Sequence, residues 1–154
     1  MSTNGNQLNA AVTKLRNNMN AVKSLMAKAN AANAAALNAG TPAAAAANLT
    51  KAANAGNQIN TKAIESTNIA PNAPIAQAQA NASLNVAKNN SRTAAQVANQ
   101  TVNAAAMAPT STNVGAAGTA NMHANAALNA AEKGEVTKAN NSVKKTATAV
   151  SNLK

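Results

Sequence analysis

The stretch over residues 8–29, LNAAVTKLRNNMNAVKSLMAKA, decides the fold of this chain. Its apolar residues recur at alternating intervals of four and three, at Leu8, Val12, Leu15, Met19, Val22, Met26 and Ala29. This spacing predicts one apolar stripe along an α-helix, close to the seam of a coiled coil. The opposite surface is expected to be basic, because four cations lie off the stripe: Lys14, Arg16, Lys23 and Lys28. We expect the helix to cover residues 6–39 and Gly40 to end it.

Proline sets the limits of the next two predicted helices. Thr41-Pro42 has the form of an N-cap followed by proline in the first helical position, so a second helix is expected over 42–68. Gly56 within it predicts a weak turn or a close backbone approach. The residues before Pro71 and Pro74 are disfavoured in helix, which ends this segment and starts a third helix over 74–108.

Two shorter helices are expected in the last third of the chain. Pro109 and the Ser/Thr residues after it predict a loop and a cap before a helix over 114–132. Gly134 then separates this helix from a fifth, over 136–153. In the fifth helix the valines recur every seven residues, so they share one face: Val136, Val143 and Val150.

Composition points to the same fold class. The chain has 154 residues, of which 45 are alanine and 28 are asparagine, and none is aromatic or cysteine. Alanine has the highest helix propensity, whereas asparagine prefers caps and turns and weakens the prediction without reversing it. We therefore expect an all-α protein: a single unit over residues 1–154 with three to five helices in hairpins or an elongated bundle. The rival interpretation is a low-complexity chain that is disordered or β-aggregating.

The supply of large apolar side chains is small for this length, with 9 Val, 8 Leu, 4 Ile and 5 Met. Because burial of such side chains is the main stabilising term, we expect a marginal monomer whose core is completed by oligomeric or assembly contacts. The candidate helix-packing and interface residues are those of the first stripe and the last one: Leu8, Val12, Leu15, Met19, Val22, Met26, Val136, Val143 and Val150.

A formal net charge of +10 makes an anionic neighbour plausible, namely nucleic acid, an acidic lumen or an acidic protein, against the alternative of a solvated surface. The cations are dispersed, and Lys144-Lys145 is the only adjacent pair. Contact with nucleic acid would be independent of sequence, because two arginines and no rings leave little for base recognition. The candidate anion contacts are Lys14, Arg16, Lys23, Lys28, Lys88, Arg92, Lys144 and Lys145.

The sequence offers almost no reactive chemistry. His123 is the only histidine, and no cysteine or aspartate exists to complete a metal site. Glu132 and Glu135 have lysines beside them and are interpreted as surface ion pairs. The many hydroxyl groups lack a base and an orienting group, and no phosphate-binding glycine loop is present. We therefore expect no catalytic residue, no metal and no cofactor, and hence no enzyme. No secretory leader and no membrane span are expected either.

Three alanine-rich stretches carry a resemblance to a known class of proteins: AANAAALNAG over 31–40, TPAAAAANLTKAANAG over 41–56 and NAALNAAEKG over 125–134. In composition the chain resembles the small internal, ejection or pilot proteins of bacteriophages. The resemblance implies a non-enzymatic virion protein, located in the interior or the portal and tail region and otherwise cytoplasmic. It also implies copies of itself and other structural proteins as partners, with packaged DNA nearby.

Two other functions remain open from the sequence. A filament, coat or decoration subunit could be built from helices that self-associate along alanine seams. A protein that neutralises nucleic acid without sequence preference would use the lysines alone and would bind in a strongly salt-dependent way.

Overall fold

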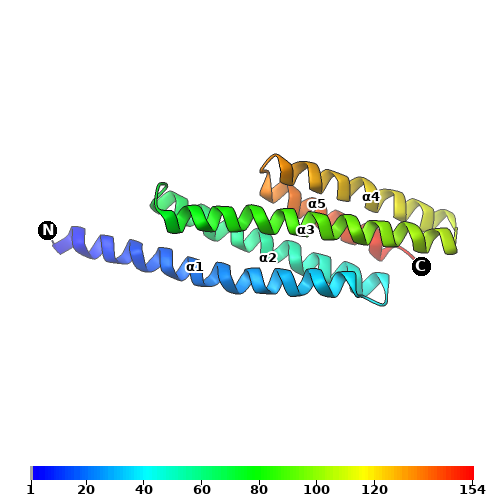
Figure 1. Ribbon diagram of the computed structural model, residues 1–154, viewed down its shortest axis with the longest axis horizontal. Helices are drawn as coiled ribbons and strands as arrows, with labels where there is room; N and C mark the ends of the chain where they lie inside the picture. Colours follow the sequence, from blue (N-terminus) through cyan, green and yellow to red (C-terminus); the bar gives the residue numbers. More distant parts are fainter. Residues whose placement is uncertain (1) are drawn as a thin grey trace.

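The computed structural model describes residues 2–154, with side chains from residue 5 onward (Figure 1). Over that range the chain forms five α-helices and no strand, which confirms the all-α prediction. The helices are α1 (Ser2–Leu37), α2 (Pro42–Ile69), α3 (Pro74–Met107), α4 (Ser111–Glu132) and α5 (Val136–Ser151). The single unit predicted over residues 1–154 includes Met1, which lies outside the described residues.

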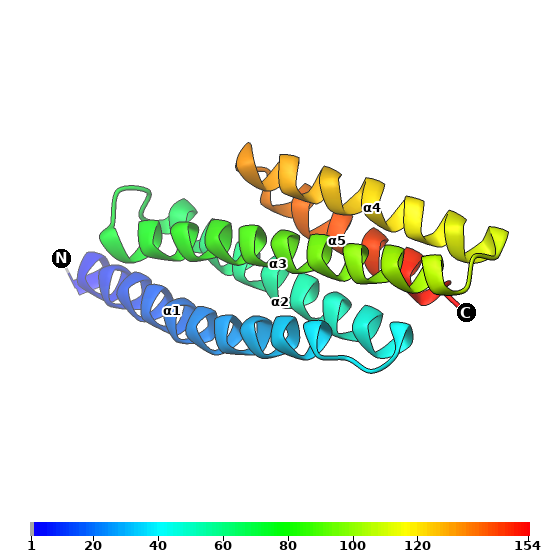
Figure 2. The ribbon, with the colours of Figure 1, turned by 45° about the vertical axis from the view of Figure 1, so that its right-hand side comes forward.

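The helices form an antiparallel, elongated bundle in which α2 and α3 are central (Figures 1 and 2). α1 packs on one side of this pair, against both α2 and α3. The α4–α5 hairpin packs on the other side, where α5 contacts α2 and α3 while α4 contacts α3 and α5. Among the described residues α1 makes no contact with α4 or α5. The central pair α2 and α3 therefore contacts α1 on one side and the α4–α5 hairpin on the other.

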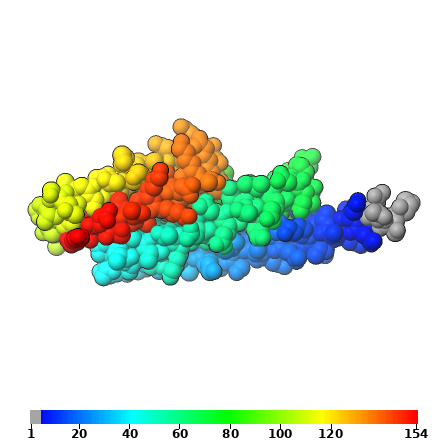
Figure 3. All heavy atoms as spheres, turned by 180° about the vertical axis from the view of Figure 1, so that it is seen from behind, coloured from blue at the N-terminus to red at the C-terminus, as the bar shows by residue number. Residues whose placement is uncertain are grey.

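The first turns of α1 extend beyond the turn that joins α2 to α3 (Figures 1 and 3). As a result Leu8 is 65 % exposed and Val12 is 36 % exposed. Leu15 is the first buried side chain of the helix. The predicted apolar stripe therefore begins to bury only at Leu15, because no neighbouring helix reaches the earlier turns.

From Leu15 onward the buried face of α1 is also rotated from the predicted one. It runs through Leu15, Asn18, Val22, Ala29, Ala32 and Ala36, with Leu25 partly buried between them. Three predicted positions belong to this face, but Met19 and Met26 lie at its edge and are only partly buried. The buried positions still alternate intervals of three and four, so the coiled-coil-like periodicity holds with a different set of residues.

Alanine fills most of the interior. The largest core cluster contains Leu49, Val97, Val143 and Val150 among alanines of every helix. A second cluster, around Val22, Ile59 and Val86, joins α1 to α2 and α3. In α3 the buried face runs through Val86, Thr93, Val97, Thr101 and Ala105.

The proline-capped helix starts are confirmed. The side chain of Thr41 accepts a hydrogen bond from the backbone N–H of Ala44 at 3.1 Å, and Pro42 occupies the first helical turn of α2. Ala70 and Ala73, which precede the two prolines of the α2–α3 turn, have non-helical backbone angles. The structure thus follows the rule that a residue before proline avoids helix.

Other ends differ from the prediction: α1 begins at Ser2 rather than at residue 6, α2 ends at Ile69 rather than at 68, and α3 ends at Met107 rather than at 108. α1 ends at Leu37 rather than at residue 39, and Gly40 does not adopt the left-handed conformation of a glycine cap, because the only described residue with positive φ is Gly134. Extended Thr41, which caps α2, stops the chain from continuing as helix. α4 begins at Ser111 rather than 114, since Thr110 caps it by accepting from Asn113 N–H at 3.1 Å. The end of α5 is Ser151 rather than residue 153.

Gly134 lies between α4 and α5 as predicted, with φ of 77°. Its N–H donates to Ala131 O at 3.0 Å, and the next N–H, of Glu135, donates to Ala130 O at 2.9 Å. This pair of bonds is a Schellman motif, which needs a residue in the left-handed region and therefore favours glycine. The tight reversal returns α5 along the central pair.

Candidate functional site

The histidine and the carboxylates of the described residues are the first candidates for a functional site. No group of three histidine or carboxylate side chains in the described structure could hold a metal ion. His123 is half-buried on α4, and Glu132 and Glu135 lie at the α4–α5 turn, where Glu135 pairs with Lys138 at 3.4 Å. The features of the molecule that remain to be explained are its buried amides, its exposed apolar faces and its grooves.

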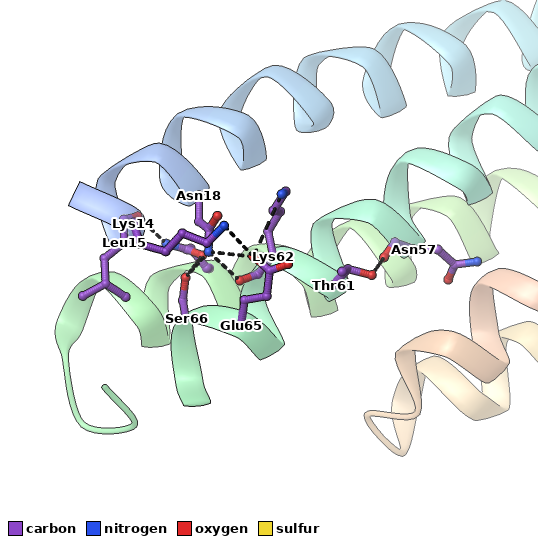
Figure 4. Close-up of polar contacts among 9 residues, drawn as sticks. Lys14, Leu15, Asn18, Asn57, Thr61, Lys62, Glu65 and Ser66 are labelled. Atoms are coloured by element: carbon purple, nitrogen blue, oxygen red, sulfur yellow. Dashed lines mark hydrogen bonds and ion pairs between the residues drawn. The ribbon is translucent and has the colours of Figure 1, made fainter. Parts of the chain in front are cut away.

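A polar cluster joins α1, α2 and α3 near the end of the bundle where α1 projects (Figure 4). Asn18 Nδ2 donates to Ser66 Oγ at 3.0 Å, and Ser66 Oγ donates to Gln79 Oε1 at 2.6 Å. Gln79 Nε2 then donates to the backbone oxygen of Leu15 at 3.1 Å. The three side chains are buried, so each hydrogen bond satisfies a group that would otherwise be costly to remove from water.

The carboxylate of Glu65 borders this cluster on the solvent side. It accepts from Asn18 Nδ2 at 3.3 Å and lies 3.5 Å from Lys14 Nζ and 4.0 Å from Lys62 Nζ. Its side chain is 37 % exposed, so these ion pairs are screened by solvent. Lys14, a predicted anion contact, is therefore paired with a carboxylate of its own chain.

A second polar cluster crosses the middle of the bundle. Asn90 of α3 donates through Nδ2 to the backbone oxygen of Ala52 at 2.9 Å and to Asn140 Oδ1 at 3.1 Å. Its Oδ1 accepts from Asn33 Nδ2 at 2.8 Å. One fully buried amide thus connects α3 to α1, α2 and α5.

The second cluster depends on a glycine. A Cβ at position 56 would lie 2.7 Å from Asn140 Nδ2 and 2.8 Å from Asn140 Oδ1. A close approach does occur at Gly56, but the approaching group is a side-chain amide of α5 rather than the backbone that was predicted. Any larger residue at this position would have to displace Asn140.

A third buried amide holds the last residues of the chain against the start of α4. Asn113 Nδ2 donates to the backbone oxygens of Ala108 and Lys154, both at 2.9 Å. The N–H of Lys154 donates in return to Asn113 Oδ1 at 2.8 Å. Asn113 therefore fixes the α3–α4 turn to the segment after α5.

This role of asparagine was not predicted. Asparagine was expected as a cap or turn former, whereas the buried amides of Asn18, Asn90 and Asn140 lie within helices. One signal was available: Asn18 lies three residues after Leu15 and four before Val22, on the same face of α1. A polar residue at such a position predicts a buried amide with a partner on a neighbouring helix.

The predicted packing residues fall into three groups. Leu15, Val22, Val143 and Val150 are buried within the chain, and Val136 packs partly buried against a small alanine cluster of α3, α4 and α5. Met19 and Met26 lie half-buried beside the core. Only Leu8 and Val12 are exposed, on the projecting turns of α1.

The predicted anion contacts do not gather on one surface. Arg16, Lys23 and Lys28 are exposed on α1, while Lys145 is exposed and Lys144 half-buried on α5. Lys88 and Arg92 line a shallow depression of about 220 Å³ between α3 and α4, but Glu132 lines the same depression. Its carboxylate lowers the affinity of that place for an anion.

A larger groove lies between α1 and α2 on the molecular surface. It has a volume of about 550 Å³, and its floor includes the buried Ala32 of α1 and Ala55 of α2, with the exposed Ala31 and Ala35 beside them. Its rim carries Lys28 from α1 and Lys51 from α2, together with side-chain amides of α2. We call this feature the α1–α2 groove.

The outward surface of α4 contains a short apolar strip. Val114, Gly118 and Met122 follow one another at intervals of four, so they share one side of the helix, and Gly115 lies beside them. Val114 is 57 % exposed and Met122 is 59 % exposed. Between residues 111 and 131 the only ionisable side chain is His123. We call the surface of Val114, Gly115, Gly118 and Met122 the α4 outer face.

Over residues 2–154 no helix carries an apolar stretch of the length that a lipid bilayer requires. Comparison of the chain with protein-family models, with curated proteins and with solved structures gave no match. Its function is therefore argued from its own residues.

Proposed function

We propose that the protein is a non-enzymatic structural component of a larger assembly, and that this assembly is a bacteriophage virion. The α4 outer face is the observation that carries the first part of the proposal. The second part rests on the resemblance in composition and on the slender shape of the bundle.

The two glycines of the α4 outer face have no explanation within the chain. A Cβ built at Gly115 or at Gly118 would meet nothing within 4 Å, and neither glycine has a positive φ. Each glycine in a helix interior lowers stability by about 1 kcal/mol relative to alanine. A requirement for close approach by another molecule would explain both, because glycine allows a neighbouring backbone to come near.

Electrostatics favour a second copy of the chain as that neighbour. With a net charge of +10, two copies repel one another over most of their surfaces. α4 lies at the outer edge of the bundle (Figure 2), and the residues of the α4 outer face carry no charge. Two such faces could pack Val114 and Met122 of each copy across the glycines without a like-charge penalty.

The virion part of the proposal is supported by shape and composition. The bundle is long and narrow, and its core consists mainly of alanine, with a few larger aliphatic side chains, several amides and no aromatic ring. Such helices separate at a small cost in buried apolar area, which suits a protein carried through or held within a portal or tail channel. A filament, coat or decoration subunit would use the α4 outer face in the same way, and the copy number per particle would distinguish these roles.

Self-association tests the first part of the proposal. We expect the purified chain to form dimers or larger species by light scattering and sedimentation, and the double variant Val114→Asn/Met122→Asn to be monomeric. Val102→Asn, which changes a partly exposed valine of α3, is the matched control and should still associate. A chain that stays monomeric at high concentration and high salt would contradict the proposal.

Particle analysis tests the second part. Mass spectrometry of gradient-purified particles from the source organism should detect the chain at a fixed ratio to the major capsid protein. Its absence from such particles would remove the virion assignment and leave the self-association result unaffected.

A further inference from the structure

The α1–α2 groove has the chemistry of a site for one more helix. Near the projecting end of α1, the contact between α1 and α2 is filled by larger side chains, including Val22 and Ile59. Further along the same pair, alanines take their place, and the surface is hollowed to about 550 Å³. A groove between two antiparallel helices accepts a third helix, whose side chains enter it at intervals of three and four.

The charge around the groove is positive on both sides. Lys28 projects from α1 and Lys51 from α2, and no carboxylate lines the groove. α1 contains no acidic residue, and the only one in α2, Glu65, is engaged by Lys14 and Lys62. Within this chain, therefore, nothing on either helix is placed to neutralise the two lysines of the rim.

This pattern argues against two other occupants. A second copy would bring its own excess of cations to the two lysines. A nucleic acid backbone would use the lysines but would leave the alanine floor without an apolar partner, and the chain has no rings for base stacking.

We propose that the α1–α2 groove is the docking site for an acidic α-helix of another protein. That helix places small or medium apolar side chains on Ala31 and Ala35, and its flanking carboxylates lie against Lys28 and Lys51. The amides of Asn54 and Gln58 on the rim supply hydrogen-bond donors and acceptors to its polar edge. The inference rests on the proposed function, since it names the partner chemistry of a protein that works within an assembly.

A designed peptide provides the test. The probe is a labelled synthetic helix of about 20 residues, roughly 30 Å long, with alanine and leucine on one face and glutamate on both flanks. Its binding to the full chain is followed by fluorescence anisotropy. A lysine-flanked version, a scrambled acidic peptide and a short DNA duplex are measured beside it.

Two variants change the groove itself. Lys28→Glu/Lys51→Glu should weaken binding of the acidic helix by about tenfold or more, and it should gain affinity for the lysine-flanked helix. Lys23→Glu/Lys145→Glu alters the net charge equally at exposed positions outside the groove, and it should leave the affinity within about threefold. Ala35→Leu should abolish binding by filling the groove, while circular dichroism confirms that the helices are retained.

Several results would overturn the inference: no binding of the acidic helix, equal loss in both charge variants, equal binding of the scrambled peptide, or DNA binding that depends on Lys28 and Lys51. None of these results bears on the α4 outer face, because self-association is tested with a separate variant, Val114→Asn/Met122→Asn. If the acidic helix does not bind but the chain still self-associates, only the assignment of the partner is contradicted. If the probe binds but the chain neither self-associates nor enters particles, the proposed function falls instead.

Discussion

The amide of Asn140 on α5 occupies the space that a side chain at Gly56 on α2 would need, with 2.7 Å between Asn140 Nδ2 and an ideal Cβ at that position. Asn140 is fully buried, and its Oδ1 accepts a hydrogen bond from Asn90. The absence of a Cβ at Gly56 on α2 thus makes room for the amide of Asn140, which links α5 to α3. This relationship shows how a chain with few large apolar residues builds a specific interior.

Gly56→Ala is expected to destabilise the protein even though alanine is the better helix former. Helix propensity alone would add about 1 kcal/mol of stability. Displacing Asn140 would break its buried hydrogen bond, at a cost of about 1–3 kcal/mol, so the net change should be a loss of about 1–2 kcal/mol. Urea unfolding followed by circular dichroism measures this difference.

A double-mutant cycle with Asn140→Ala identifies the cause. If the methyl group acts through Asn140, the two changes should be coupled by about 1 kcal/mol or more, because the second removes the clash of the first. Additive effects would mean that Gly56 is needed for some other reason.

Removal of the Asn90 amide should be one of the most damaging single changes in the chain. Asn90→Ala leaves Asn33 Nδ2 and Asn140 Oδ1 without their partners inside the bundle. We expect a loss of about 2–4 kcal/mol in the free energy of unfolding. Asn85→Ala, at an exposed position of the same helix, should be neutral or slightly stabilising by helix propensity. Equal effects of the two variants would contradict the role of the buried amide.

The cluster in Figure 4 should owe its stability to the buried amide rather than to the ion pairs. Gln79→Ala removes the partner of Ser66 and of the Leu15 backbone oxygen and opens a cavity, so it should cost about 2–4 kcal/mol. Glu65→Gln should cost less than about 1 kcal/mol, because the carboxylate is partly exposed. Raising the salt concentration should reduce the Glu65 effect and leave the Gln79 effect unchanged. A larger loss for Glu65→Gln would reverse this ranking.

Local signals in the sequence were enough to locate the helices. Thr41-Pro42, Pro74 and Gly134 act through backbone geometry that depends on their immediate neighbours, so their effects could be predicted without the fold. The ends that were predicted wrongly involve choices between neighbouring residues. Thr110 caps α4, although a later start was predicted. The extended Thr41, rather than Gly40, stops the chain from continuing as helix after α1.

The interior could not be predicted in the same way, since it depends on which helices meet. Leu8 continues the apolar periodicity of α1, yet it is exposed because α2 and α3 end before reaching it. Asn18 and Met19 are adjacent in the sequence, and hydropathy favours burial of the methionine. The structure buries the asparagine instead, because Ser66 on α2 offers it a partner. The α1–α2 groove could not be predicted for the same reason, because its lining residues come from two helices.

Gly118→Ala should separate the needs of the monomer from those of the assembly. Within the chain the new methyl group meets nothing within 4 Å, so α4 should gain up to about 1 kcal/mol of stability and the melting temperature should rise. Between copies the same methyl group holds two backbones apart, so self-association measured by sedimentation should weaken. Thr119→Ala, at the adjacent exposed position, is the control and should leave association unchanged. If Gly118→Ala stabilises the chain and leaves association intact, the glycine has no role in contact between copies, and the α4 outer face loses its strongest support.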